Sequence, residues 1–318
     1  MAIETVAVIG AGTMGHALAL VHALGGCRVA LHDRDEAVLA RAGGQIAAAC
    51  ETLIDAGALD PARAAVVQDA ITMAPALSAA VSGADLVVEA VVETAEVKRA
   101  VFDEIDRHAP EQAIIASNTS YLDIFPLVPE VRQPRAAIAH WYTPPYIVDL
   151  VDLAPGPATR PETTEALRRL YAGFGKVPLM FDRLVPGYVA NRLQAALNLE
   201  CLRMIEEGWA DAEDIDLSIR HGLVHRLAVQ GHMRKMDFTG LEMVRNGIAS
   251  RMYQPPENTG CSPVLERLIA AGRTGIRSGA GFFDYGDTAP DVLCRDRDLR
   301  LLQLKAQLRD IMEGQESD

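Results

Sequence analysis

Residues 6–15 read Val-Ala-Val-Ile-Gly-Ala-Gly-Thr-Met-Gly, and this stretch decides the fold class of the 318-residue chain. Its pattern Gly-x-Gly-x-x-Gly stands directly after a strand-like run and directly before a helical stretch, His16–Leu24. In that context the first glycine permits a tight turn, the second lets the backbone approach a pyrophosphate, and the third allows close packing of helix on strand. The N-terminus of the helix offers free N–H donors to phosphates. The stretch therefore predicts a dinucleotide-binding βαβ unit. The predicted cofactor contacts are Gly10, Gly12, Thr13, Met14 and Gly15.

The second predicted strand ends at Asp33, 18 residues after Gly15. A carboxylate at this distance accepts hydrogen bonds from the adenine ribose hydroxyls and repels a 2′-phosphate, so Asp33 favours NAD over NADP. Arg34 argues in the other direction, because an arginine here can pair with the 2′-phosphate of NADP. Asp33 stands at the strand end itself, and we therefore expect NAD.

The first half of the chain alternates short strand-like runs with Ala-rich helical stretches. This rhythm predicts an α/β fold with a mostly parallel, doubly wound sheet, a Rossmann domain. The runs are Thr5–Ile9, Arg28–His32, Leu86–Glu89, Ala113–Ala116, Ala136–Ala139 and Val148–Leu153.

The pattern changes after Val185-Pro186-Gly187, where Pro-Gly is a plausible break between domains. From Tyr188 onward apolar residues recur at spacings of three and four, which is typical of helices. We expect a Rossmann domain at 1–185 and an all-α domain at 186–318 that ends in an amphipathic helix, Asp298–Met312.

Composition excludes several classes of partner. The formal net charge of −13 and the pI near 5.1 argue against nucleic acid and anionic membranes. The five cysteines show no C-x-x-C spacing, so we expect free thiols and no metal site. The N-terminus lacks the features of a signal peptide, and no apolar run reaches the roughly 18 residues of a membrane span, which predicts a cytoplasmic protein.

Five further segments carry a family resemblance over about residues 4–285. Taken together and in this order, they resemble the 3-hydroxyacyl-CoA dehydrogenase family. They are Asp85-Leu-Val-Val-Glu-Ala-Val-Val-Glu93 with Glu96-Val-Lys98, Ser117-Asn-Thr-Ser120, His140…Pro144…Leu150-Val-Asp152, Pro186-Gly-Tyr-Val-Ala-Asn191-Arg192, and Gly275-Ile-Arg-Ser-Gly279-Ala-Gly281-Phe-Phe-Asp-Tyr285.

The resemblance implies the site residues. It pairs His140, as general base, with the Asp152 carboxylate, which fixes the imidazole tautomer and stabilises the imidazolium. It also implies that Ser120 and Asn191 hold the substrate oxygen and the nicotinamide side. The remaining cofactor-binding residues by resemblance are Glu93, Lys98 and Asn118.

Two positions depart from the family pattern. Asp152 stands where the family has glutamate, one methylene longer, which leaves the charge but puts the His–carboxylate distance in question. Thr143 stands where the family has asparagine, so a substrate contact made there by an amide is lost or made by a hydroxyl.

Charge argues against an acyl-CoA substrate. CoA phosphates need Lys or Arg, which the family's acyl-CoA enzymes place in the excursion after the second strand. Here Glu36–Ala84 has no lysine, and its two arginines stand against five acidic residues. The pattern of Pro144-Pro145-Tyr146 with Asp149 and Asp152 also resembles most closely the branches acting on small 3-hydroxy acids. Among them are the L-gulonate 3-dehydrogenases related to λ-crystallin, the L-carnitine dehydrogenases and a pyridine-ring dehydrogenase of vitamin B6 breakdown.

The identity of the small acid stays open. An aromatic wall of Trp141, Tyr142 and Tyr146 would suit a quaternary ammonium or a ring, but core packing explains these residues equally well. A carboxylate clamp would need an arginine or lysine. The candidates for it are Arg192, Arg226, Arg234 and Lys235.

Three functions remain to be distinguished. The first is an NAD-dependent oxidation of the 3-hydroxyl of a small acid. The second is an L-3-hydroxyacyl-CoA dehydrogenase, and the third is a catalytically silent NAD-binding protein of the crystallin kind. In each case the helical half, Tyr188–Asp318, is expected to form a homodimer.

Overall fold

The computed structural model describes residues 2–313. The chain divides into two compact units, the first ending at Tyr188 and the second beginning at Val189. The boundary expected from the sequence, 185/186, lies just before this point. No helix among the described residues combines the length and the apolar character that crossing a membrane requires.

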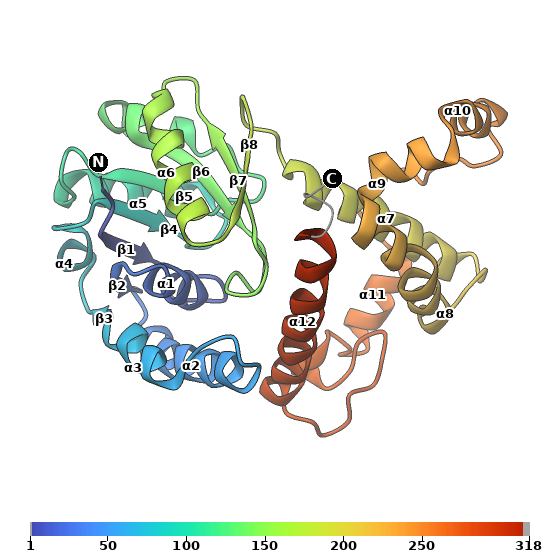
Figure 1. Ribbon diagram of the computed structural model, residues 1–318, viewed down its shortest axis with the longest axis horizontal. Helices are drawn as coiled ribbons and strands as arrows, with labels where there is room; N and C mark the ends of the chain where they lie inside the picture. The colour runs from blue at the N-terminus through green and yellow to red at the C-terminus, as the bar shows by residue number, and fades with distance from the viewer. Residues whose placement is uncertain (1, 314–318) are drawn as a thin grey trace. The chain divides into compact units, whose positions relative to one another are not determined.

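The first unit contains one eight-stranded sheet in the order β3-β2-β1-β4-β5-β6-β7-β8 (Figure 1). All neighbouring strands run parallel except β6 and β7, which are antiparallel. The predicted doubly wound sheet is confirmed. The strands are β1 Thr5–Ile9, β2 Arg28–His32, β3 Ile71–Ala74, β4 Leu86–Glu89, β5 Ile114–Ser117, β6 Ala136–Trp141, β7 Leu150–Pro155 and β8 Val177–Met180.

Helices cover both faces of this sheet (Figure 1). On one face α1 (Gly15–Leu24) packs on β1 and β2, and α6 (Pro161–Gly173) packs on β6, β7 and β8; α2 (Glu36–Asp55) and α3 (Pro61–Asp69) pack against α1. The other face is covered by α4 (Leu77–Val81), α5 (Ala95–His108) and the 3₁₀ turn η1 (Phe125–Leu127). A second 3₁₀ turn, η2 (Glu130–Arg135), precedes β6.

The two outermost strands, β3 and β8, were not expected from the sequence. Two of the four residues of β3 and three of the four residues of β8 are exposed. An edge strand buries little apolar surface, so its sequence lacks the continuous β-branched run that marks a central strand.

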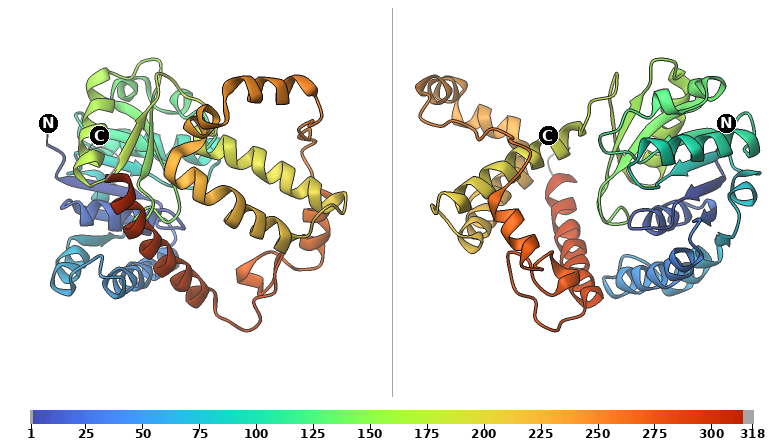
Figure 2. Two further views of the ribbon diagram at one scale, coloured as in Figure 1. Left: turned by 45° about the vertical axis from the view of Figure 1, so that its right-hand side comes forward. Right: turned by 180° about the vertical axis from the view of Figure 1, so that it is seen from behind.

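The second unit is helical, as predicted (Figure 2). Its last helix begins eight residues earlier than expected, at a proline whose missing N–H costs nothing in the first turn. The helices are α7 Tyr188–Glu206, α8 Ala212–Ser218, the π-helical turn η3 Ile219–Val224, α9 His225–Thr239, α10 Leu241–Ser250, α11 Pro263–Ala270, the 3₁₀ turn η4 Ile276–Ser278 and α12 Pro290–Glu313.

The second unit buries few of its own apolar side chains. Helices α9 and α10 contain no buried residue. In both views of Figure 2, α10 (orange) projects away from the other helices of this unit. The buried hydrophobic residues from Val189 onward, among those described, are Ile215, Val264 and Leu302.

Candidate active site

The glycine-rich turn between β1 and α1 has the conformation that dinucleotide binding requires. Gly10 has φ +96°, and a Cβ there would come within 2.6 Å of the Ala90 carbonyl oxygen. A Cβ on Gly15 would collide with the Gly10 carbonyl, so this glycine permits the close turn into the helix. Space around the Cα of Gly12 is open, and a phosphate can approach its backbone. Thr13 is exposed and Met14 half-buried at the start of α1.

A cavity of about 480 Å³ lies beside this turn. Gly10, Gly12, Asp33 and Arg34 form part of its lining, together with apolar residues such as Val91 and Val97. Asp33 Oδ2 accepts the Ala11 N–H at 2.8 Å, and its Oδ1 accepts the Asp35 N–H at 2.9 Å. These bonds hold the carboxylate at the rim of the cavity. Its lining and its place beside the glycine turn fit the adenosine half of a dinucleotide.

Lys98, on α5, is enclosed by carboxylates. Its Nζ lies 2.7 Å from Glu89 Oε1 and 3.3 Å from Glu93 Oε2, and the residue is 1% exposed. Ser117, at the end of β5, donates to the other oxygen of Glu89. Glu89 is fully buried, so no water solvates its negative charge. The lysine supplies the positive charge that balances it.

Glu93 organises the loop that follows β5. Its Oε1 accepts hydrogen bonds from the Thr119 hydroxyl at 2.6 Å and from the N–H groups of Ser120, at 2.9 Å, and Tyr121, at 3.1 Å. Burial raises the pKa of Glu93, but the bonds from Thr119 and Tyr121 and the charge of Lys98 outweigh it and lower the pKa to about 2. Glu93 is therefore ionised and fixes Ser120 in place.

Ser120, His140 and Asp152 form a hydrogen-bonded chain. Ser120 Oγ lies 3.2 Å from His140 Nε2, and His140 Nδ1 lies 3.4 Å from Asp152 Oδ2. The antiparallel register of β6 and β7 pairs His140 directly with Asp152, which explains their approach across 12 residues of sequence. Both residues are buried. A buried carboxylate beside one ring nitrogen leaves the other nitrogen available for proton transfer.

Two tyrosines enclose the imidazole. The Tyr188 ring stacks on it, with centroids 4.6 Å apart, and the Tyr142 ring meets it edge-on at 4.7 Å. Tyr188 has a left-handed backbone, φ 48°, and donates its hydroxyl to the Thr119 carbonyl at 2.8 Å. Burial, followed by the charges of Asp152 and Glu93, raises the pKa of Tyr188, so its hydroxyl stays a donor. The sequence analysis did not predict that Tyr142 and Tyr188 pack on His140. For Tyr188 the available signal was the tyrosine in Pro186-Gly-Tyr, where the family has phenylalanine.

Asn118, Thr143 and Asn191, the other residues singled out by the family pattern, lie in separate segments of the chain. Asn118 Oδ1 accepts the Trp141 N–H at 2.9 Å and so ties the loop after β5 to the end of β6. Thr143, the family's asparagine position, donates to Met14 Sδ at 3.1 Å. Asn191 lies half-buried in the first turn of α7.

Trp141 cannot be part of an aromatic wall around a substrate. Side chains alternate along a strand, so Trp141 points to the face opposite His140. There it is 2% exposed and packs against His22 of α1 and Tyr171 of α6, with ring centroids 6.0 and 4.8 Å away. Of the two interpretations, core packing is correct for this residue.

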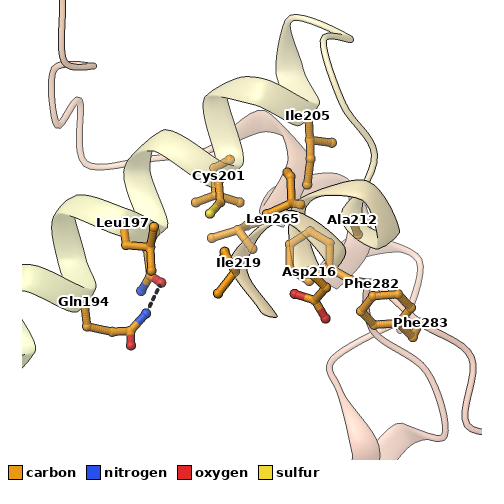
Figure 3. Close-up of a pocket in the computed structure, with 13 residues that line it drawn as sticks. Gln194, Leu197, Cys201, Ile205, Ala212, Asp216, Ile219, Leu265, Phe282 and Phe283 are labelled. Carbon is orange, nitrogen blue, oxygen red and sulfur yellow. Dashed lines mark hydrogen bonds between the residues drawn. The ribbon is translucent and has the colours of Figure 1, made fainter. Parts of the chain in front are cut away.

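The second unit has a cavity of its own, of about 390 Å³ (Figure 3). Its wall is mainly apolar and includes Leu197, Ile205, Ile219, Phe282 and Phe283. Among residues 2–313, Asp216 is the one charged residue that lines it. Among residues 2–313, no group of three His, Cys, Asp or Glu side chains is arranged to hold a metal ion.

A glycine turn beside an acidic strand end, with a buried Ser–His–Asp chain three strands away, defines a dinucleotide-dependent dehydrogenase. Residues 5–183 match the family "3-hydroxyacyl-CoA dehydrogenase, NAD binding domain", and residues 187–285 match the family "3-hydroxyacyl-CoA dehydrogenase, C-terminal domain". The chain belongs to the 3-hydroxyacyl-CoA dehydrogenase family, and its cofactor is NAD.

Relatives in this family act on different substrates. The chain is 32% identical over 315 residues to 5-formyl-3-hydroxy-2-methylpyridine 4-carboxylate 5-dehydrogenase of Mesorhizobium japonicum, covering 99% of this chain and 100% of the relative. A crystal structure of an enzyme of that name, described as an NAD⁺-dependent dismutase, superimposes with a TM-score of 0.86 at 30% identity, over 97% of this chain and 99% of the other. A 3-hydroxybutyryl-CoA dehydrogenase of Mycobacterium tuberculosis is 33% identical over 291 residues, 89% of this chain and 99% of the relative.

Proposed function

We propose that this protein oxidises the 3-hydroxyl of a small 3-hydroxy acid to the 3-oxo acid, with His140 as the general base. The observation that carries the proposal is the chain Ser120–His140–Asp152, in which Nε2 of a buried imidazole faces the Ser120 hydroxyl, the group proposed to hold the substrate oxygen. NAD, when bound, supplies the hydride acceptor. His140 Nε2 takes the hydroxyl proton as the C–H bond breaks and the carbonyl forms. Asp152 stabilises the resulting imidazolium.

The glycine-turn motif and the family resemblance supply the other proposed site residues. We assign the contacts of NAD to the glycine turn, Asp33 and Asn118, with Glu93 and Lys98 acting at the nicotinamide side through the loop they support. The family resemblance supports the assignment of Ser120 and Asn191 to the substrate oxygen and the nicotinamide side. In this proposal residues 1–185 bind NAD, and residues 186–318 bind substrate and form the dimer.

Charge in the α2–α3 region favours a small acid over an acyl-CoA. Of the two arginines there, Arg63 already donates its guanidinium to the Leu24 carbonyl at 2.9 Å. Asp35 and Asp60 accept N–H groups at the starts of α2 and α3 and add negative charge on this side. A polyanionic CoA tail would be repelled here. The pyridine carboxylate substrate in the name of the Mesorhizobium relative is also small and acidic.

The second candidate is an L-3-hydroxyacyl-CoA dehydrogenase, favoured by the 33% identity to the mycobacterial 3-hydroxybutyryl-CoA enzyme. Following NADH formation with a panel of free 3-hydroxy acids, and NADH consumption with acetoacetyl-CoA, separates the two. Turnover of the free acids alone supports the proposal. Turnover of acetoacetyl-CoA alone would assign the protein to the acyl-CoA branch of the family. Absence of turnover with both, in protein that binds NAD, indicates a silent NAD-binding protein.

We further propose a homodimer formed through the second unit. Large apolar side chains are exposed along its helices, including Met233 at 71%, Phe238 at 79% and Ile248 at 75%. Monomers rarely expose so much apolar surface in one region, whereas obligate dimer interfaces require it. Light scattering at micromolar concentration is expected to give twice the 34.2 kDa chain mass. A monomeric mass there would contradict this part of the proposal.

A further inference from the structure

We propose that Tyr142 is a positioning residue that tunes His140 as a base, by sharing the Asp152 carboxylate with it. This inference rests on the proposed function. It is carried by one contact: the Tyr142 hydroxyl donates to Asp152 Oδ2 at 2.5 Å, the same oxygen that faces His140 Nδ1 at 3.4 Å. Of the two donors, the tyrosine is the closer one.

The Asp152 carboxylate has few other means of balancing its charge. The residue is 0% exposed, and its second oxygen, Oδ1, is buried without a hydrogen-bond partner among the described residues. An ionised carboxylate in such a place needs donors, because burial removes the water that would otherwise solvate it. Tyr142 and His140 are the donors that the structure supplies.

The family departure at this position explains why a tyrosine is needed. Aspartate is one methylene shorter than the glutamate of the family pattern, and its oxygen stays 3.4 Å from the imidazole, beyond the 2.7–2.9 Å usual for a charge-assisted bond. Tyr142 reaches the carboxylate from the end of β6, two residues after His140, and packs its ring edge against the imidazole. The same side chain thus orients both members of the pair.

Sharing the carboxylate has a chemical consequence. A hydrogen bond from Tyr142 draws negative charge away from the oxygen that would stabilise the imidazolium. The other groups that face His140 are Ser120 from the loop after β5 and the stacked Tyr188 at the start of α7. Behind that loop lie Glu93 and Lys98, and Lys98 also pairs with the buried Glu89, so one lysine serves two carboxylates. With Tyr142 in place, Asp152 therefore stabilises the imidazolium less, and the neutral imidazole stays ready to act as a base.

The test is the pH profile of kcat/KM for oxidation in the whole protein. Tyr142→Phe keeps the ring but removes the donor, so the acidic limb should move to higher pH by about one unit, the effect of a hydrogen bond to a charged group. Incorporating 3-fluorotyrosine at position 142 keeps shape and hydroxyl but gives a stronger donor, and the limb should move to lower pH. Tyr253→Phe is the matched control, because it removes an exposed tyrosine–carboxylate bond of 3.0 Å to Glu200. Its profile should equal that of the wild type.

The outcomes separate this inference from the proposed function. If His140→Gln abolishes turnover while both Tyr142 variants keep the wild-type limb, Tyr142 has no such role, although His140 is still the base. If Tyr142→Phe lowers kcat/KM by the same factor at every pH, the contribution of Tyr142 is purely structural, and this result also overturns the inference. Opposite shifts in the two variants support it. Should His140→Gln remain active, the proposed function itself is wrong.

Discussion

Mild acid should destabilise this protein through His22 of α1, which lies in a cluster of aromatic side chains between α1, β6 and α6. The residue is 0% exposed between Trp141, Tyr171 and Phe174. Burial lowers the pKa of His22 from 6.5 to about 4, although the hydrogen bond of its Nδ1 with the Leu18 carbonyl opposes the shift. The folded protein keeps this imidazole neutral under conditions in which an unfolded chain protonates it.

The sign and size follow from proton linkage. Because the folded-state pKa lies below the unfolded value, stability is complete above pH 6.5 and falls as the pH decreases from 6.5 to about 4. Each pH unit in this window removes about 1.4 kcal/mol. Between about pH 7 and about pH 5, His22 should therefore remove about 2 kcal/mol from the free energy of unfolding. Other groups add their own pH dependence, so a variant is needed to isolate this one.

His22→Phe retains an aromatic ring in the cluster and cannot titrate. Urea unfolding followed by far-UV circular dichroism at both pH values should show that the wild type loses about 2 kcal/mol more than the variant. His108→Asn is the control, since His108 is exposed on α5 and meets solvent in both states. The reasoning is refuted if wild type and His22→Phe lose the same stability, or if His108→Asn behaves like His22→Phe.

Three further predictions concern function. His140→Gln should lower turnover by about 10²–10⁴-fold while NAD affinity, measured by fluorescence, is retained; near-normal turnover in the folded variant would exclude His140 as the base. Asp33→Ala should weaken NAD binding and reduce the preference for NAD over NADP. The change removes the carboxylate that accepts hydrogen bonds from the ribose hydroxyls, and it leaves the Ala11 N–H without this acceptor. A wild type that prefers NADP would show instead that Arg34 governs the choice. Free CoA should not raise Tm, whereas a small 3-hydroxy acid with NADH at 100 times its Kd should stabilise the fold by about 2.7 kcal/mol. A salt-sensitive shift with acetoacetyl-CoA would favour the acyl-CoA branch.

Local patterns in the sequence were sufficient for the class of the fold. The glycine turn and the central strands β1, β2 and β4 have the expected bounds, because a buried parallel strand must be a continuous apolar run and a glycine turn needs particular backbone angles. The helical second half was also evident, since the spacing of three and four is a local property. The edge strands β3 and β8 were not predicted, because they bury too little surface to require a continuous apolar run.

The arrangement of the candidate site depended on contacts that no local pattern contains. The sequence supplied Ser120, His140 and Asp152, but only the register of β6 against β7 places the last two opposite each other. The left-handed backbone of Tyr188 aims its ring at the imidazole, and the alternation along β6 turns Trp141 away from it. Tyr142 reaches Asp152 only once both strands are paired. Sequence thus determined which groups are present and which elements they occupy, whereas tertiary structure decided which groups share a carboxylate, because hydrogen bonds act over a few ångströms between residues distant in the chain.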